Sequence, residues 1–304
     1  MNAVEIDSAR LTFGRVTALG DFSCAIPPGS VTVLLGPNGA GKTTALRVIT
    51  GALRLDSGEV RVFGLDPVAN GAEVRLRCGV VSAQPALYGR LSGRDNLRYS
   101  AELFGASLDA VEPSAARFGI DYALDTKVAT YSTGMKTRLA LARAVLHEPE
   151  LLLLDEPTSG LDPESGQAVL RLIREYAAGG RTVVMCTHLL AEAEGLADQV
   201  VILDDGRDLI TGAPDELVGR FWPTPSVLMD AADRAALSVI AGLDGVVSVD
   251  LNGGPATVAI DDIDRVPELV ATLSKRGVRL TKVIPHEPTL EELYFEVRRR
   301  ERTQ

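Results

Sequence analysis

The chain has 304 residues, of which 46% are hydrophobic and 24% are charged, a composition typical of a globular protein with room for two domains. Its formal net charge of −10 argues against nucleic acid as the main partner, because phosphate backbones attract basic surfaces. Three scattered cysteines, Cys24, Cys78 and Cys186, show no paired spacing, and we expect free thiols.

The sequence contains no signal for membrane insertion or secretion. No apolar run approaches the roughly 20 residues that a membrane-spanning helix requires. The first ten residues, MNAVEIDSAR, lack the basic start and apolar core of a secretory signal. We therefore expect a protein that is cytoplasmic or lies on the cytoplasmic side of a larger assembly.

The first two thirds of the chain are typical of an α/β domain with a largely parallel sheet. Residues 4–13 and 59–63 alternate like half-buried antiparallel strands. Nearly continuous apolar runs predict strands buried on both faces at residues 31–36, 151–155, 182–187 and 199–203. The pattern between residues 85 and 147 is mostly helical.

The last third is typical of a smaller α+β domain, so we expect domains at 1–220 and 225–304. Two prolines break the pattern within residues 219–225. The order that follows is that of a ferredoxin-like unit: strand 226–229, helix 231–243, strand 246–251, a turn at Asn252-Gly253-Gly254, strand 256–260, helix 264–276 and strand 279–284. A final helix is predicted at 289–299, with a capping box formed by Thr289 and Glu292.

The segment GPNGAGKT matches the phosphate-binding pattern G-x-x-x-x-G-K-[ST] and lies between an apolar strand and a helix-like stretch. Gly36 and Gly41 permit a tight loop whose N–H groups surround a polyphosphate. Lys42 is expected to reach the β- and γ-phosphates, and the Thr43 hydroxyl to bind Mg²⁺.

Polar residues follow several of the predicted strands. Asp155 and Glu156 end LLLLDE, where Asp155 is placed to complete the Mg²⁺ shell and Glu156 to polarise an attacking water. Gln84 follows GVVSA and His188 follows TVVMCT. Taken alone, two acidic residues after a strand are more often a solvated loop or a helix cap, and Gln84 or His188 alone is more often a polar residue that caps a strand. Together they predict a site for a γ-phosphate and its water at one edge of the sheet.

A second stretch, YSTGMKTR at 131–138, places small and hydroxyl residues at the start of a predicted helix. Helix starts bind anions through free N–H groups and the helix dipole. One chain therefore carries two candidate phosphate-binding elements almost a hundred residues apart.

In this order the motifs resemble the nucleotide-binding subunits of ABC transporters over about residues 3–218, including SGLDP at 159–163. The resemblance implies a P-loop NTPase cassette: a RecA-like parallel core, an antiparallel β subdomain and a helical subdomain at about 85–147. It implies ATP and Mg²⁺ as ligands, and it implies that Thr43, Gln84 and Asp155 bind the metal. The catalytic residues that it implies are Lys42, Glu156 and His188. The nucleotide-binding residues that it implies are Phe13, Val16, Asn38, Gly39, Ala40, Gly41, Lys42, Thr43 and Thr44.

The resemblance also gives the second element a role, because in this family it closes over the ATP of a partner cassette. It implies a homodimer in which Ser132, Thr133, Gly134 and Met135 act in trans, with Asp162 in a loop at the dimer contact. The usual family residues at 133 and 135 are Gly and Gln. Because Ser132 and Gly134 remain, we expect a competent ATPase; the alternative is a cassette that binds ATP without hydrolysing it.

LSGRDNLRYSAELFG (91–105) and EPTLEELYFEV (287–297) are similar to the type-2 exporter branch, which includes drug-resistance and sodium-export ATPases. This implies a motor at the cytoplasmic face of the membrane that drives a separate transmembrane permease, with no nucleic acid partner. A drug, lipid, ion or polysaccharide substrate is equally compatible. One alternative is a soluble ABC ATPase, but such a protein would usually carry a second cassette or a coiled coil, and the sequence shows neither. Another is a different P-loop enzyme, such as a GTPase, but no N-K-x-D motif occurs. A third is that residues 226–304 act as a sensor.

Overall fold

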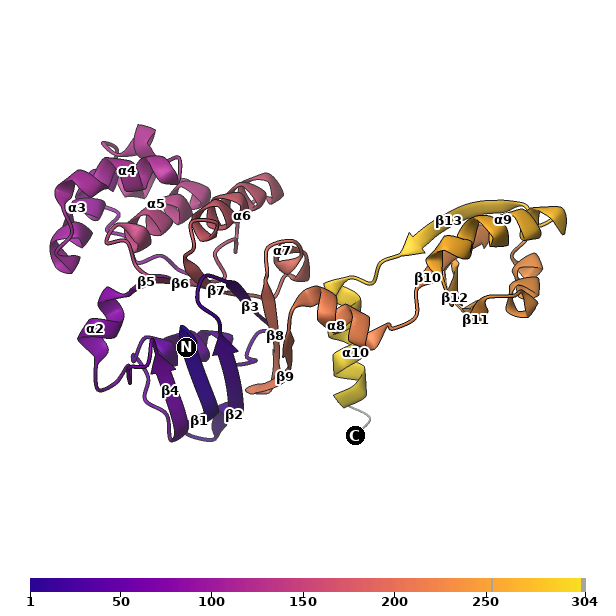
Figure 1. The fold of residues 1–304 in the computed structure, drawn as a ribbon. Helices are drawn as coiled ribbons and strands as arrows, with labels where there is room; N and C mark the ends of the chain where they lie inside the picture. The colour runs from indigo at the N-terminus through magenta and orange to yellow at the C-terminus, as the bar shows by residue number, and fades with distance from the viewer. Residues whose placement is uncertain (253, 302–304) are drawn as a thin grey trace. The chain divides into compact units, whose positions relative to one another are not determined.

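The computed structural model describes residues 1–252 and 254–301, and the chain divides into two compact units, Met1–Pro214 and Asp215–Gln304 (Figure 1). Gly253, in the predicted turn, lies outside the described residues, as does the end of the predicted second domain at 302–304. Within the described ranges no helix combines the length and the apolar character needed to cross a membrane.

A six-stranded sheet forms the centre of the first unit, in the order β5-β6-β7-β3-β8-β9. Its first five strands are parallel, and β9 pairs antiparallel with β8. The bounds are β3 Val31–Leu35, β5 Cys78–Val81, β6 Leu151–Asp155, β7 Thr182–Thr187, β8 Gln199–Asp204 and β9 Arg207–Gly212. All residues of β3, β6 and β7 are buried, which explains and confirms their continuous apolar runs.

A separate antiparallel sheet, formed by strands before and after β3 in the chain, packs on this core. It contains β1 (Val4–Phe13), β2 (Val16–Ile26) and β4 (Ser57–Val62) in the order β2-β1-β4. The helices α1 (Lys42–Ile49) and α2 (Gly71–Leu76) follow β3 and β4 in the chain. One hydrophobic cluster includes buried residues from both sheets and from α1, so the antiparallel sheet and the loop that connects β3 to α1 share a core. The three cysteines are free and buried.

The predicted helical segment contains α3 (Gly93–Phe104), α4 (Val111–Arg117) and α5 (Thr133–Val145), joined by three short 3₁₀ turns at Leu108–Ala110, Asp121–Ala123 and Val128–Thr130. Ser92 caps α3 and Ser132 caps α5 by accepting hydrogen bonds from backbone N–H groups. The helices α6 (Pro163–Ala177) and α7 (Leu190–Ala193) follow β6 and β7 (Figure 1).

The second unit contains a four-stranded antiparallel sheet in the order β11-β12-β10-β13. Its elements are α8 (Pro214–Phe221), β10 (Ser226–Ala231), a 3₁₀ helix (Arg234–Gly242), β11 (Val246–Asp250), β12 (Ala256–Ile260), a 3₁₀ turn (Ile263–Arg265), α9 (Val266–Lys275), β13 (Leu280–His286) and α10 (Leu290–Glu301). This is the predicted ferredoxin-like order, with α8 before it and α10 after it.

Two details of this unit refine the sequence-based expectation. The first predicted helix is of the 3₁₀ type, and its buried residues Leu237 and Ile240 are spaced by three, as a helix with three residues per turn requires. The capping box of α10 is confirmed, because the Glu292 N–H donates to Thr289 Oγ1 at 3.2 Å and the Thr289 N–H donates to Glu292 Oε2 at 2.9 Å.

Candidate functional site

The loop between β3 and α1 surrounds a cavity of about 230 Å³. Glycine is required at two of its positions. A Cβ on Gly36 would lie 2.4 Å from the Leu203 carbonyl oxygen; one on Gly41, where φ is 105°, would lie 2.6 Å from the Ala18 carbonyl oxygen. The cavity is lined by Val16, Thr17, Ala18, Asn38, Gly39, Ala40, Gly41, Lys42, Thr43, Thr44, Ala83, Asp155 and Glu156.

Lys42 is the first residue of α1 and its side chain is only 6% exposed. Its Nζ donates to the carbonyl oxygens of Gly36 at 2.6 Å and Pro37 at 3.1 Å, and it lies 3.6 Å from Glu156 Oε1. A buried ammonium group requires such acceptors. The cation is thus held over the loop, where it would meet a bound anion.

The next residue along α1, Thr43, contacts the end of β6. Its hydroxyl donates to Asp155 Oδ2 at 2.9 Å and lies 3.1 Å from Oδ1. Burial raises the pKa of Asp155, as does the nearby Glu156 charge, while the Thr43 hydrogen bond and Lys42 act in the opposite direction. The Thr43 hydroxyl and the Asp155 carboxylate both line the cavity and are hard oxygen ligands, so these residues fit Mg²⁺.

Glu156 lies between two partners from different elements. Its Oε2 lies 2.7 Å from His188 Nδ1, while its other carboxylate oxygen, Oε1, is the one that contacts Lys42. Its backbone has a φ of 49° and its N–H donates to the Cys186 carbonyl oxygen at 2.9 Å. A positive φ in a non-glycine residue is uncommon and must be held by its surroundings. The hydrogen bond to Cys186 of β7 supplies part of that restraint.

Two predicted ligand residues lie beside the cavity but do not line it. Phe13 pairs with Val16 at the turn between β1 and β2, and it is 51% exposed, so its ring face is free to stack. Gln84 is exposed, while its neighbour Ala83 lines the cavity.

The residues of the second phosphate-binding element do not line this cavity either. Ser132 accepts a hydrogen bond from the Met135 N–H at 3.2 Å and, with Thr133, is exposed at the start of α5, whereas Gly134 and Met135 are half-buried. Asp162 caps α6 by accepting a hydrogen bond from the Ser165 N–H at 2.9 Å. A Cβ on Gly134 would meet Ser165 Oγ at 3.7 Å, so the starts of α5 and α6 lie together.

One carboxylate near the site had no signal in the sequence. Glu192, on α7, accepts hydrogen bonds from the hydroxyls of Thr158 and Thr187. No motif points to it. Thr187, the last residue of β7, is only five residues away in the sequence, but Thr158 lies in the loop after β6, and the folded sheet is needed to bring it to Glu192.

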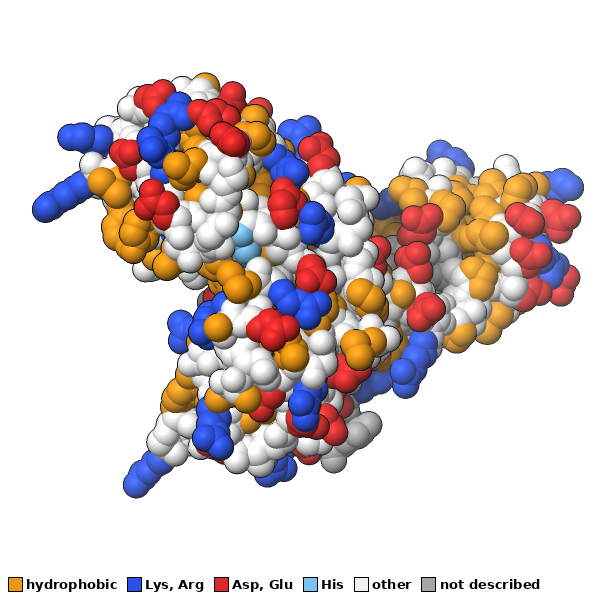
Figure 2. All heavy atoms as spheres, turned by 60° about the vertical axis from the view of Figure 1, so that its left-hand side comes forward, with side chains coloured by type: hydrophobic (Ala, Val, Ile, Leu, Met, Phe, Trp, Pro, Cys, Tyr) orange, Lys and Arg blue, Asp and Glu red, His pale blue; other side chains and the backbone are white. Residues whose placement is uncertain are grey.

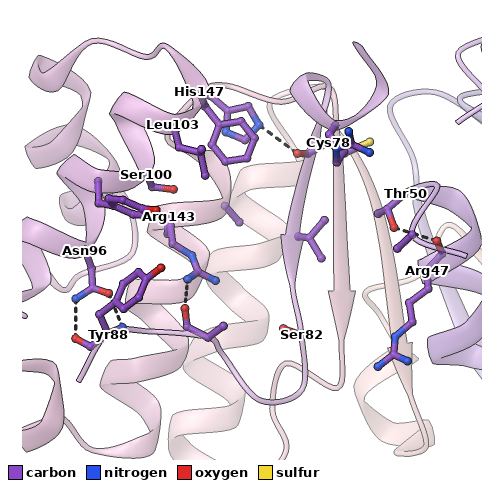
Figure 3. A pocket seen from close by; sticks show the side chains of 17 residues that line it. Arg47, Thr50, Cys78, Ser82, Tyr88, Asn96, Ser100, Leu103, Arg143 and His147 are labelled. Carbon is purple, nitrogen blue, oxygen red and sulfur yellow. Dashed lines mark hydrogen bonds between the residues drawn. The ribbon is translucent and has the colours of Figure 1, made fainter. Parts of the chain in front are cut away.

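A second cavity of about 600 Å³ lies between the helical segment and helices α1 and α2. Figure 3 shows Tyr88, Arg143 and His147 on one wall and Arg47 and Thr50 on the opposite wall. Figure 2 shows the notched side of the first unit, with hydrophobic, basic and acidic side chains on the surface around the notch. Arg75 also lines this cavity, and none of the described residues that line it is Asp or Glu.

Comparisons with known proteins agree with this geometry. The family model described as ABC transporter matches residues 19–159. The chain is 36% identical over 303 residues to daunorubicin resistance ATP-binding protein DrrA2 of Streptomyces coeruleorubidus, covering 96% of this chain and 94% of that one. It is also 36% identical over 242 residues to Nod factor export ATP-binding protein I of Paraburkholderia xenovorans strain LB400, covering 75% and 79%.

Among solved structures, one described as the ATP binding subunit of an ABC transporter is similar to this chain with a TM-score of 0.66 and 30% identity. The likeness covers 72% of this chain and 93% of that one. It confirms the predicted cassette fold for the larger part of the molecule.

Proposed function

We propose, because this chain belongs to the family of ABC transporter ATP-binding proteins, that it is the ATP-hydrolysing subunit of an exporter. The observation that carries the proposal is the position of Glu156, which lies between Lys42 and His188 beside a phosphate-binding loop. The names of the relatives, which concern drug resistance and Nod factor export, support the exporter branch. We assign ATP hydrolysis to residues 1–220, and residues 225–304 form a separate C-terminal domain.

Nucleotide binding would use the groups that already converge on the loop. The N–H groups of the loop and the Lys42 ammonium bind the phosphates, and Phe13 stacks on the adenine with Val16 beside it. Thr43, Asp155 and Gln84 would hold Mg²⁺, which supplies positive charge against the phosphate oxygens. Gln84 must turn inward from its exposed position to join them.

Hydrolysis would depend on Glu156 as the general base. Its carboxylate accepts a proton from the water that attacks the γ-phosphate, and the attack is in line with the leaving oxygen. His188 holds Glu156 through its Nδ1 contact, which leaves its other ring nitrogen available for the γ-phosphate. Lys42 exchanges a carbonyl acceptor of its own loop for a phosphate oxygen, which keeps the buried cation paired throughout.

The second phosphate-binding element would serve the ATP of a second copy of the chain. Ser132 and Gly134 stand at an exposed helix start outside their own cavity, a position suited to contacts in trans. Two such contacts related by a two-fold axis give a homodimer that encloses two ATP molecules. ATP favours the closed dimer because it contacts both chains only in that state.

A Glu156→Gln variant tests this scheme. It retains the shape of the side chain but removes the base, so Mg-ATP should accumulate a dimer that light scattering detects. A Lys42→Ala variant, which lacks the phosphate contact, should stay monomeric under the same conditions. The scheme is wrong if the Glu156→Gln chain remains monomeric while it binds ATP. Steady-state hydrolysis by the unmodified chain separates a working ATPase from a cassette that only binds ATP.

The larger cavity is where we place the transmembrane partner, and this placement puts the chain at the cytoplasmic face of the membrane. Tyr88 and Tyr99 are half exposed and Leu103 is 68% exposed, which provides apolar docking surface. Arg47, Arg75 and Arg143 form no ion pair within residues 1–252 and 254–301. An apolar segment that carries a carboxylate would complement this lining. Gln84 follows β5 at the edge of this cavity and would transmit the state of the nucleotide to it.

A further inference from the structure

The carboxylate of Glu192 connects two loops that carry catalytic side chains. Its Oε1 accepts a hydrogen bond from the Thr158 hydroxyl, and its Oε2 accepts one from the Thr187 hydroxyl at 2.7 Å. Thr158 is 5% exposed and Thr187 is fully buried. Hydrogen bonds of hydroxyls to an ionised carboxylate are stronger than those between neutral groups. Glu192 therefore fixes both hydroxyls to one rigid group.

The two threonines stand next to the reactive residues in the sequence. Thr158 lies two residues after Glu156, and the Ser159 N–H donates to the Glu156 carbonyl oxygen at 3.1 Å, which closes a tight turn. Thr187 directly precedes His188, and its hydroxyl also accepts a hydrogen bond from the Leu189 N–H at 3.0 Å. The hydroxyl of Thr187 thus bonds on both sides, to Glu192 and to the backbone just beyond His188.

We propose that Glu192 is a positioning residue that holds the loops of Glu156 and His188 at the spacing their 2.7 Å contact requires. Glu192 does not line the nucleotide cavity, so it acts on the chemical step through these loops and leaves ATP binding unchanged. The inference rests on the proposed ATPase function. Small displacements of a positioned catalytic group reduce rate strongly.

Kinetics of the full-length chain test this role. Glu192→Ala should lower kcat about tenfold while KM for ATP changes less than about twofold. Glu192→Gln, which can still bond both hydroxyls, should recover most of the rate. Thr158→Val should lower kcat and Thr158→Ser should restore it. Because both residues act through one contact, the Glu192→Ala/Thr158→Val double variant should be no slower than Glu192→Ala alone. Glu175→Ala, an exposed carboxylate on α6, is the charge-matched control and should match the unmodified chain.

A second measurement needs no hydrolysis. Hydrogen–deuterium exchange of the nucleotide-free chain should be faster in peptides covering residues 156–162 and 187–192 for Glu192→Ala and Thr158→Val, and unchanged for Glu175→Ala. The inference is overturned if neither peptide exchanges faster, if kcat of Glu192→Ala equals that of the unmodified chain, or if Glu192→Gln is as slow as Glu192→Ala. An unmodified chain that hydrolyses no ATP would contradict the proposed function instead, and the exchange result would still decide the role of Glu192.

Discussion

Two ionisable side chains, Lys42 and Asp155, are largely buried in the wall of the same cavity, and burial of each charge opposes folding. Lys42 is compensated by two carbonyl oxygens and by Glu156. Asp155 is compensated less well, since burial is the largest influence on its pKa and raises it. A carboxylate kept at such a position is explained by its function, because a hard oxygen ligand is required there.

Asp155→Asn should therefore raise the free energy of unfolding at pH 7 while it weakens Mg-ATP binding. The folded chain binds a proton at Asp155 at a higher pH than the unfolded chain, whose pKa is near 3.8. The loss of folding stability caused by ionised Asp155 in the wild type therefore grows as pH rises from the unfolded pKa to the folded pKa. Above the folded pKa this loss is complete. Urea unfolding at several pH values should show the advantage of the variant at pH 7 disappear below about pH 3.8.

Asp162→Asn is the matched control with the opposite sign. Hydrogen bonds from Ser165 lower the pKa of Asp162, so its charge favours the folded state above its unfolded pKa. This variant should be less stable than the wild type at neutral pH, and the difference should vanish in acid. An Asp155→Asn chain that is less stable than the wild type at pH 7 would contradict the account of Asp155.

At the scale of elements, the start of α5 combines a structural role with a proposed binding role. Ser132 caps the helix and also carries the hydroxyl that we place on a partner's phosphate. Replacement by Ala removes both functions at once. A substitution that keeps the cap but changes the charge separates them.

Ser132→Asp should leave stability unchanged, because Asp accepts the Met135 N–H as well as Ser does and suits the helix dipole. ATP binding to the monomer should also persist, since Ser132 lies outside that cavity. Hydrolysis should fall more than tenfold, because the carboxylate would repel the partner's γ-phosphate, an effect of roughly 2 kcal/mol or more. The neutral cap Ser132→Asn should retain more activity, and Ser132→Ala should lose about 1 kcal/mol in urea unfolding. Equal hydrolysis by the Asp variant and the wild type would exclude a role in trans.

The strands that the sequence predicts best are those buried on both faces, because burial of that kind demands an unbroken apolar run. The sequence pattern does not predict β2 and β9, and the reason is physical. β2 contains Gly20 and Asp21, the latter with a φ of 88°, and its register with β1 shifts, while β9 is only partly buried. The phosphate loop and the Asp155–Glu156 pair are local motifs and can be read directly. Glu192 cannot be identified in this way, because its contact with Thr158 exists only after β6 and β7 pair.

At the scale of the whole molecule, the nucleotide site depends on one unit. A hydrophobic cluster of the first unit contains residues from Val4 to Leu203, and the second unit has its own cluster between Val227 and Val278. Every residue of the proposed ATP site lies within Met1–Pro214. Two separate cores allow each unit to fold around its own apolar interior.

A chain ending at residue 222, which retains α8 whole, should therefore fold and bind Mg-ATP with an affinity within about twofold of the full chain, because no group of the site is removed. Fluorescent nucleotide titration measures the affinity, and circular dichroism with thermal unfolding shows whether the core is intact. Comparing ATP hydrolysis and dimerisation of the truncated chain with those of the full chain then shows what residues 223–304 contribute. If both are unchanged, its role is regulation or docking; if dimerisation alone is lost, it contributes to the dimer. A truncated chain that is folded but fails to bind ATP would show that the nucleotide site needs residues 223–304.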